Sequence, residues 1–225
     1  ILGDYFFVSG RTGNRNKNPN KYLDDAKILS DAFENPEEEW LKARYAFYCG
    51  QSYKDAGKVE ESIKWYKETL KQQAWTQEKF YAAFMIGQMS LELGRKEEGI
   101  YYCLHTLQYD SKRWEGVHRA VRYLIENGEP NVATVILSGL DLSDPIDPRE
   151  DGRLFIDEAV HDYLLLMDII IHCCNHGRPD ISRKAIHMLY DNVQRLSEPI
   201  AGNTLFNSQF CTSAVPSEME DHFEK

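Results

Sequence analysis

The sequence has no apolar run long enough to cross a membrane. The longest run, residues 164–174, is interrupted by Asp168 and His172 and is shorter than the roughly 18 residues that a spanning helix needs. Basic residues are also scarce, 26 against 36 acidic ones, which gives a formal net charge of −10. This balance argues against a protein that coats nucleic-acid phosphates, because such proteins need an excess of Lys and Arg on at least one face.

Cysteines are few and odd in number, five among 225 residues, which is typical of reduced thiols. We therefore expect a cytoplasmic protein. The sequence contains no Walker loop, no G-x-G-x-x-G and no G-x-S-x-G motif, so the common nucleotide-binding and serine-nucleophile signatures are absent. The first residue is Ile rather than Met. We therefore expect the chain to be a piece of a longer polypeptide.

Against this background the sequence has a period. Gly57, Gly94 and Gly128 each follow an amphipathic segment, and their spacings are 37 and 34 residues. Glycine adopts the left-handed conformation that ends a helix at no steric cost, so each glycine predicts a turn between two helices. A similar turn is predicted at Gly177.

Small and large residues recur around these turns. Five residues after each of the first three glycines stand Ser62, Gly99 and Ala133, and four residues further on stand larger side chains: Tyr66, Cys103 and Leu137. Small residues let two helices approach closely while larger neighbours fill the space beside them. The recurrence resembles the 34-residue tetratricopeptide (TPR) pattern, with Gly50 and Gly87 at its glycine place and Tyr53 at its tyrosine place.

The predicted fold is an all-α, TPR-like, right-handed solenoid of about four helix pairs, with an irregular helical bundle as the alternative. Residues 1–19 are predicted to be a linker from a missing catalytic domain, residues 20–200 the repeat domain and residues 201–225 an irregular acidic tail. Asn35-Pro36 followed by three glutamates predicts a helix start, because it combines a cap, a first-turn proline and dipole-stabilising carboxylates. Pro130 and Pro179 predict two more starts, and the fourth pair is predicted at about 154–176 and 179–196.

Two stretches resemble a known family. The first is a loop from Ser9 to Arg15 that leads into the helix from Lys21, and the second is the repeat from Arg44 to Gly57 with Trp75 downstream. Together they resemble the C-terminal part of family 2 glycosyltransferases that carry a TPR-like helical extension.

The resemblance implies a parent enzyme that moves a sugar from a nucleotide donor. The GT-A type active site of such enzymes needs an Asp-x-Asp-like pair for a divalent metal and a catalytic base, and the first half of this chain has no such pair. We therefore expect the catalytic centre, with its metal and nucleotide-sugar, to lie upstream, and this chain to contain no catalytic residue and no cofactor of its own.

Arg11 and Arg15 are the candidate substrate-binding residues. Two guanidinium groups in a glycine-containing loop suit bidentate contact with a diphosphate or a carboxylate. The alternative is that they hold the domain junction through ion pairs.

Two further groups have a chemical and a structural interpretation. His172 and His176 stand at helical spacing beside Cys173 and Cys174, but no second pair of ligands stands at a matching interval, so we favour a helix end over a zinc site. The many tyrosines and phenylalanines are compatible with a sugar-stacking platform, yet most have the spacing of a helical core.

In TPR proteins the first helix of each pair lines a concave groove. Transferring that register predicts a mildly basic groove lined by Arg44, Phe47, Gln51, Lys54, Tyr81, Phe84, Gln88, His118, Arg119 and Arg122. We therefore expect a protein or peptide partner, or self-association. The predicted function is a non-catalytic interaction module of a glycosyltransferase, and the alternatives are a free-standing TPR adaptor and an enzyme complete within these residues.

Overall fold

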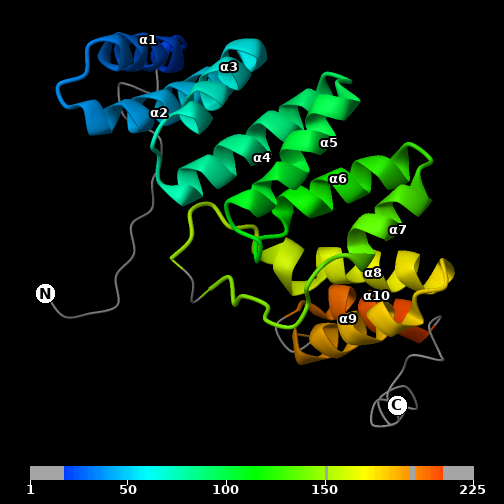
Figure 1. The fold of residues 1–225 in the computed structure, drawn as a ribbon. Helices are drawn as coiled ribbons and strands as arrows, with labels where there is room; N and C mark the ends of the chain where they lie inside the picture. Colours follow the sequence, from blue (N-terminus) through cyan, green and yellow to red (C-terminus); the bar gives the residue numbers. More distant parts are fainter. Residues whose placement is uncertain (1–17, 150–151, 193–195, 210–225) are drawn as a thin grey trace, which may run out of the picture. The chain divides into compact units, whose positions relative to one another are not determined.

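The computed structural model describes residues 18–149, 152–192 and 196–209. Arg11 and Arg15 lie outside these residues, as does the predicted linker except for residues 18 and 19. Within them the chain contains ten α-helices and no strand, so the predicted all-α class is confirmed and a helical solenoid is compatible with it (Figure 1). The chain divides into two compact units, Ile1–Ala74 and Trp75–Lys225, where the sequence predicts one repeat domain.

The first unit contains three α-helices within the described residues. These are α1 (Lys21–Glu34), α2 (Lys42–Asp55), which follows the 3₁₀ turn η2 (Glu39–Leu41), and α3 (Val59–Lys71). Helix α2 packs against both α1 and α3. Helix α1 begins at Lys21, where the sequence indicates a helix, but the predicted start at Pro36 is wrong, because Glu38 is extended and the first helical turn begins at Glu39. Cap and dipole signals are each worth only about 1 kcal/mol, so they do not fix a helix start by themselves.

The second unit consists of three helix pairs and a final helix in the described residues. The pairs are α4 (Thr76–Glu92) with α5 (Lys96–His105), α6 (Glu115–Glu126) with α7 (Pro130–Ser138), and α8 (Leu165–Asn175) with α9 (Pro179–Asn192). Pro130 and Pro179 open their helices as predicted. Figure 1 shows that the two helices of each pair run in opposite directions. Helix α10 (Glu198–Gln209) packs on α8, so the helical part continues past the predicted boundary at residue 200.

The turn between the helices of each pair has one backbone geometry throughout. Gly57, Gly94, Gly128 and Gly177 have φ angles of +70°, +74°, +79° and +77°, which confirms the predicted left-handed turns. After each glycine the next backbone N–H donates to a carbonyl five residues earlier at 2.7–2.9 Å, the bonding of a Schellman motif. The four pairs are therefore copies of one local structure, the fourth being separated from the third by a longer loop.

The crossing of the two helices is equally regular. The residue five positions after each turn glycine is buried: Ser62, Gly99, Ala133 and Ser182. Ser62 Oγ donates to the Gly50 carbonyl at 2.9 Å, and Ser182 Oγ donates to the Ile170 carbonyl at 3.2 Å, both acceptors lying seven residues before their turn glycine.

Close approach explains the glycines at the TPR glycine place. A Cβ atom at Gly50 would lie 2.9 Å from the ring of Tyr66, and one at Gly87 would lie 2.6 Å from Cys103 Sγ. A larger residue at Gly50 would displace the Tyr66 ring, and one at Gly87 would also meet the backbone of the neighbouring helix, at the Cys103 nitrogen. The predicted need for small residues at these crossings is confirmed.

The main core of the second unit lies between its helix pairs. Trp114, Val117, Val121 and Leu124 of α6 and its approach pack with Ala133 and Leu137 of α7 and the apolar face of α8 and α9. Leu142, from the connection between α7 and α8, joins this core.

The predicted start of the fourth pair at residue 154 is wrong. Residues 154–157 are not helical; the helix begins at Glu158, and a π-helical turn, η4 (Val160–Leu164), precedes α8. Phe155 has a φ of +52°, and the Leu154 and Phe155 carbonyls accept hydrogen bonds from Arg113. This segment is held by side-chain contacts instead of a helix, which apolar spacing alone does not reveal.

Candidate functional site

The groove residues predicted in the first unit lie on α2. Arg44 is exposed, and its guanidinium lies 3.3 Å from the Tyr48 hydroxyl and over the Tyr48 ring. Gln51 and Lys54 are half-buried. Phe47 is fully buried, so its predicted place in a groove is wrong: it contributes to the core through its edge contact with Tyr66.

In the second unit the predicted groove residues lie on α4 and α6. The ring of Tyr81 packs 4.7 Å from the ring of Phe155, and Gln88 donates to Glu92 on its own helix. Arg119 is half-buried near Cys103, whose pKa burial raises to about 12, an effect that Arg119 opposes. His118 and Arg122 are the two that face a pocket.

This pocket, the α6–α8 pocket, has a volume of about 450 Å³. Its polar side chains are His118, Arg122, Asp168 and Tyr163, and its apolar ones are Leu164, Met167, Ile171 and Ile200. Asp168 is the central group of this pocket. It is buried, and its Oδ1 accepts a hydrogen bond from Arg122 Nη1 at 3.3 Å. Its Oδ2 atom has no hydrogen-bond partner within the described residues, and His118 Nε2 lies 3.6 Å away.

The two titratable groups of this pocket have shifted pKa values. Burial raises the pKa of Asp168 to about 6, although Arg122 opposes the shift. Burial lowers the pKa of His118 to about 4, and the positive charge of Arg122 lowers it further. His118 is therefore uncharged at neutral pH, and Arg122 is paired with both Asp168 and Glu126. The predicted groove is therefore not basic at the α6–α8 pocket.

The arrangement suits binding. An apolar wall beside a buried carboxylate with one oxygen that lacks a hydrogen-bond partner suits an apolar side chain flanked by an N–H donor. Among the described residues no group of three or more His, Cys, Asp and Glu side chains is arranged to hold a metal ion. Within the predicted zinc candidate, Cys173 is buried 3.9 Å from the Ser138 hydroxyl, and His176 Nδ1 lies 2.7 Å from the His172 carbonyl.

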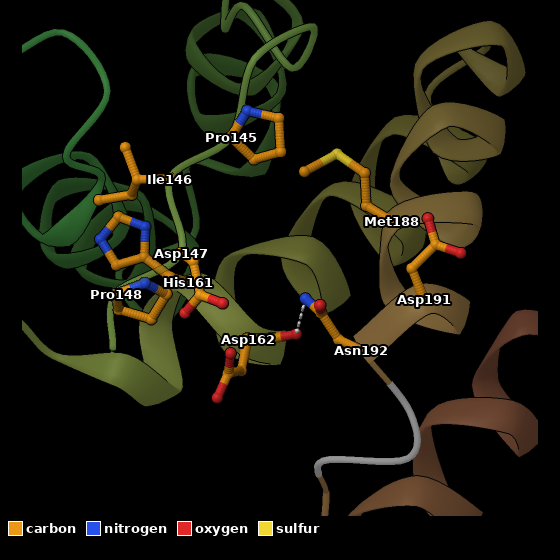
Figure 2. Close-up of a pocket in the computed structure, with 9 residues that line it drawn as sticks. All are labelled: Pro145, Ile146, Asp147, Pro148, His161, Asp162, Met188, Asp191 and Asn192. Carbon is orange, nitrogen blue, oxygen red and sulfur yellow. Dashed lines mark hydrogen bonds between the residues drawn. The ribbon is translucent and has the colours of Figure 1, made fainter. Parts of the chain in front are cut away.

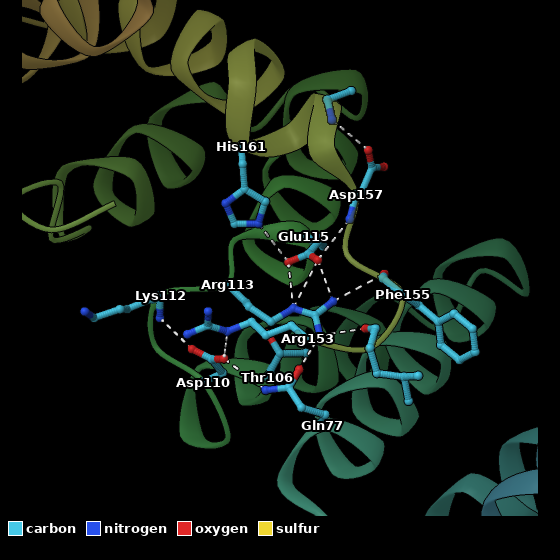
Figure 3. Close-up of polar contacts among 12 residues, drawn as sticks. Gln77, Thr106, Asp110, Lys112, Arg113, Glu115, Arg153, Phe155, Asp157 and His161 are labelled. Carbon is cyan, nitrogen blue, oxygen red and sulfur yellow. Dashed lines mark hydrogen bonds and ion pairs between the residues drawn. The ribbon is translucent and has the colours of Figure 1, made fainter. Parts of the chain in front are cut away.

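A second polar cluster, the Arg113 network, lies at the start of α6 (Figure 3). Arg113 is fully buried and donates to Glu115 through Nε at 3.1 Å and Nη2 at 2.6 Å. Its Nη1 reaches Gln77 Oε1 on α4 at 2.7 Å, and the guanidinium lies 3.8 Å from the centre of the Phe80 ring. One side chain thus links α4, α6 and the segment before α8.

Glu115 is the acceptor at the centre of this network. It accepts from Arg113, from His161 Nε2 at 3.3 Å and from the Asp157 backbone N–H at 3.3 Å. Burial raises its pKa, but the hydrogen bonds from His161 and Arg113 outweigh burial and bring the pKa to about 2. The carboxylate is therefore ionised and well satisfied, which marks the network as a structural anchor.

A smaller pocket, the loop pocket, has His161 in one of its walls. This loop pocket has a volume of about 190 Å³ and lies between residues 145–148, the π-helical turn and the end of α9 (Figure 2). Its walls are Pro145, Ile146, Asp147, Pro148, His161, Asp162, Met188, Asp191 and Asn192. The π-helical turn thus supplies His161 and Asp162 to this pocket, and Tyr163 and Leu164 to the α6–α8 pocket. Single π-helical turns are frequent at functional sites.

The sequence interpretation missed the groups that dominate these clusters. Asp168, Arg113, Glu115, His161 and Asp162 are all buried, yet none of them is among the predicted site residues. One signal was present, since Asp168 interrupts the longest apolar run of the chain. A charged residue at a core-facing position of such a helix is rarely placed there without a partner or a role.

No protein-family model matches this chain, and a search of curated proteins finds no match either. Among the helices that the structure describes, none has the length and apolar character required to cross a membrane.

Proposed function

We propose that this chain is a TPR-like solenoid that binds an extended segment of a partner protein along the face formed by α4, α6 and α8. The observation that carries the proposal is the α6–α8 pocket, which opens at groove positions that the repeat register predicts. The four helix pairs with identical glycine turns and buried small residues at their crossings support the repeat assignment.

The composition of the pocket defines the partner segment. Leu164, Met167 and Ile171 offer an apolar wall, and Asp168 Oδ2 lacks a donor within the described residues. An apolar side chain next to Lys or Arg in the partner satisfies both features. Such a ligand gains from burial of apolar area and from a charge-assisted hydrogen bond.

Selection from a random peptide display library tests this proposal. The immobilised chain is expected to enrich peptides in which an apolar residue neighbours Lys or Arg. Met167→Glu, which puts a charge into the apolar wall, should abolish the enrichment, whereas the matched Val135→Glu on α7, where the side chain is 73% exposed, should retain it. Circular dichroism confirms that both variants are folded. Absence of enrichment by the unaltered chain, or equal enrichment by the folded Met167→Glu variant, would refute the groove.

The wider proposal is that this module belongs to a family 2 glycosyltransferase. It rests on the resemblance of the Ser9–Arg15 loop and of the repeat from Arg44 to Gly57. In that setting Arg11 and Arg15 lie at the junction with the catalytic domain, and the metal and nucleotide-sugar bind to that domain. The full-length reading frame tests this statement, because an α/β domain with an Asp-x-Asp pair directly upstream is expected. A reading frame without one would favour a free-standing adaptor.

A further inference from the structure

We propose that the loop pocket binds a small organic cation with several N–H donors, such as a diamine or a guanidinium compound. This site is distinct from the proposed peptide groove and does not depend on it. The proposal rests on the size of the pocket, the hydrogen-bonding character of its walls, its charge and one buried imidazole nitrogen.

The pocket is built from three separate parts of the second unit. Loop residues 145–148 form one wall, the π-helical turn a second and the end of α9 a third (Figure 2). The pocket has a volume of about 190 Å³, whereas a single water molecule needs only about 10–15 Å³. It therefore has room for a small organic molecule.

The polar groups of the walls are mainly hydrogen-bond acceptors. The carboxylates of Asp147, Asp162 and Asp191 accept only. Asn192 uses its amide nitrogen to donate to the Asp162 carbonyl at 3.1 Å, which leaves its side-chain oxygen as an acceptor. Pro145 and Pro148 contribute no backbone N–H. A ligand that fills this space must supply the donors.

His161 adds a further acceptor. Its Nε2 lies 3.3 Å from the Glu115 carboxylate, and in the tautomer that donates from Nε2 the ring presents Nδ1 as an acceptor. The side chain is 96% buried or more, and Nδ1 has no hydrogen-bond partner within the described residues. A buried acceptor without a partner costs about 1–3 kcal/mol, and native structures rarely leave one. A donor entering the pocket beside this ring removes that deficit.

Charge decides between a cation and a neutral polyol. Arg149 forms a two-point ion pair with Asp162 and also lies 3.7 Å from Asp147 and 3.6 Å from Glu158. Asp191 forms no ion pair within the described part of the chain. The walls of the pocket therefore carry three carboxylates, of which Arg149 contacts two, and the resulting field favours a positively charged ligand.

A series of three four-carbon probes that differ in charge tests the proposal. Butane-1,4-diamine is a dication, butane-1,4-diol offers hydroxyl donors without charge, and succinate carries negative charge. We expect saturable binding of the diamine in calorimetry at low ionic strength, and no heat from succinate. In a sample labelled with ¹⁵N-histidine, the Nδ1 resonance of His161 should move with the diamine and report binding beside that ring. Equal affinity for the diol, or no saturable binding of the diamine, would overturn the proposal.

Two matched variants on α9 provide the control. Asp191→Asn removes a carboxylate of the pocket, while Asp180→Asn removes the same charge from the first turn of the same helix, outside the pocket. Both positions are exposed, so both variants are expected to fold. Asp191→Asn should weaken diamine binding about tenfold, the loss expected for one charge-assisted hydrogen bond. An equal loss in Asp180→Asn would mean that the diamine responds only to net charge, which would refute the site.

Failure here and failure of the peptide groove are distinguishable. The groove variant Met167→Glu lies outside the loop pocket and should leave diamine binding unchanged, and Asp191→Asn lies outside the α6–α8 pocket and should leave peptide enrichment unchanged.

Discussion

Two buried carboxylates in the second unit have opposite pKa shifts. Glu115 is 3% exposed and its pKa is lowered to about 2, whereas Asp168 is 5% exposed and its pKa is raised to about 6. Glu115 accepts hydrogen bonds from Arg113, His161 and a backbone N–H, while one oxygen of Asp168 has no partner in the described residues. Burial is similar, so the number of donors decides the sign.

The difference separates an anchor from a binding group. A carboxylate that the fold fully satisfies gains nothing from a ligand, and its network instead holds segments together. A buried carboxylate with one oxygen that lacks a hydrogen-bond partner lowers the stability of the folded protein. Such groups gather at functional sites. The comparison therefore favours the α6–α8 pocket for recognition and the Arg113 network for structure.

The largest expected effect comes from breaking the anchor. Arg113→Met leaves the Glu115 charge buried beside His161 without its main partner and should lower the free energy of unfolding by about 3–5 kcal/mol. Urea unfolding followed by circular dichroism measures this. The double variant with Glu115→Gln should lose less than the sum of the single variants, because the uncompensated charge is gone. Strict additivity would show that Arg113 and Glu115 are not coupled.

Asp168→Asn should act in the opposite direction. An acid whose pKa is raised in the folded state contributes stability that is fully present below its unfolded pKa of about 3.8 and is lost as the pH rises through about 6. Replacing it with a neutral amide therefore stabilises the protein above pH 6, by ~1–2 kcal/mol, and has little effect near pH 4.

Urea unfolding of both chains at pH 7.5 and pH 4 measures the Asp168 effect. Because the lowered pKa of His118 costs stability as the pH falls from 6.5 towards 4, the comparison is made between variant and parent at the same pH. A destabilised variant at pH 7.5 would mean that the Arg122 ion pair outweighs the burial of the charge.

The smallest effect is expected at Arg149. Its guanidinium pairs with Asp162 as Arg113 pairs with Glu115, but the Arg149 side chain is 37% exposed and water screens the pair. Arg149→Gln should therefore change the free energy of unfolding by less than about 1 kcal/mol. Thermal unfolding of Arg149→Gln beside Arg113→Met gives a direct comparison, and similar losses would contradict the view that burial sets the difference.

The predictions from the sequence were correct where the structure depends on residues close together in the chain. The glycine turns and the starts at Pro130 and Pro179 are set by backbone conformation within a few residues, and these predictions are confirmed. The start at Pro36 is wrong because Glu38 is extended, and the helix does not begin at residue 154, where Arg113 holds the Leu154 and Phe155 carbonyls instead. The sequence predicted two residues of the α6–α8 pocket, His118 and Arg122, but did not predict Asp168.

By itself the sequence determined that this chain forms helix pairs with tight glycine turns and small residues at their crossings. Those features follow from φ angles and side-chain volumes that each residue carries wherever it stands. Only the tertiary structure decided which charged side chains are buried together and which of them lack a donor. Arg113 and Glu115 meet groups more than 35 residues away, and the pKa of Asp168 depends on Arg122 across the helix interface, so no local pattern encodes either outcome.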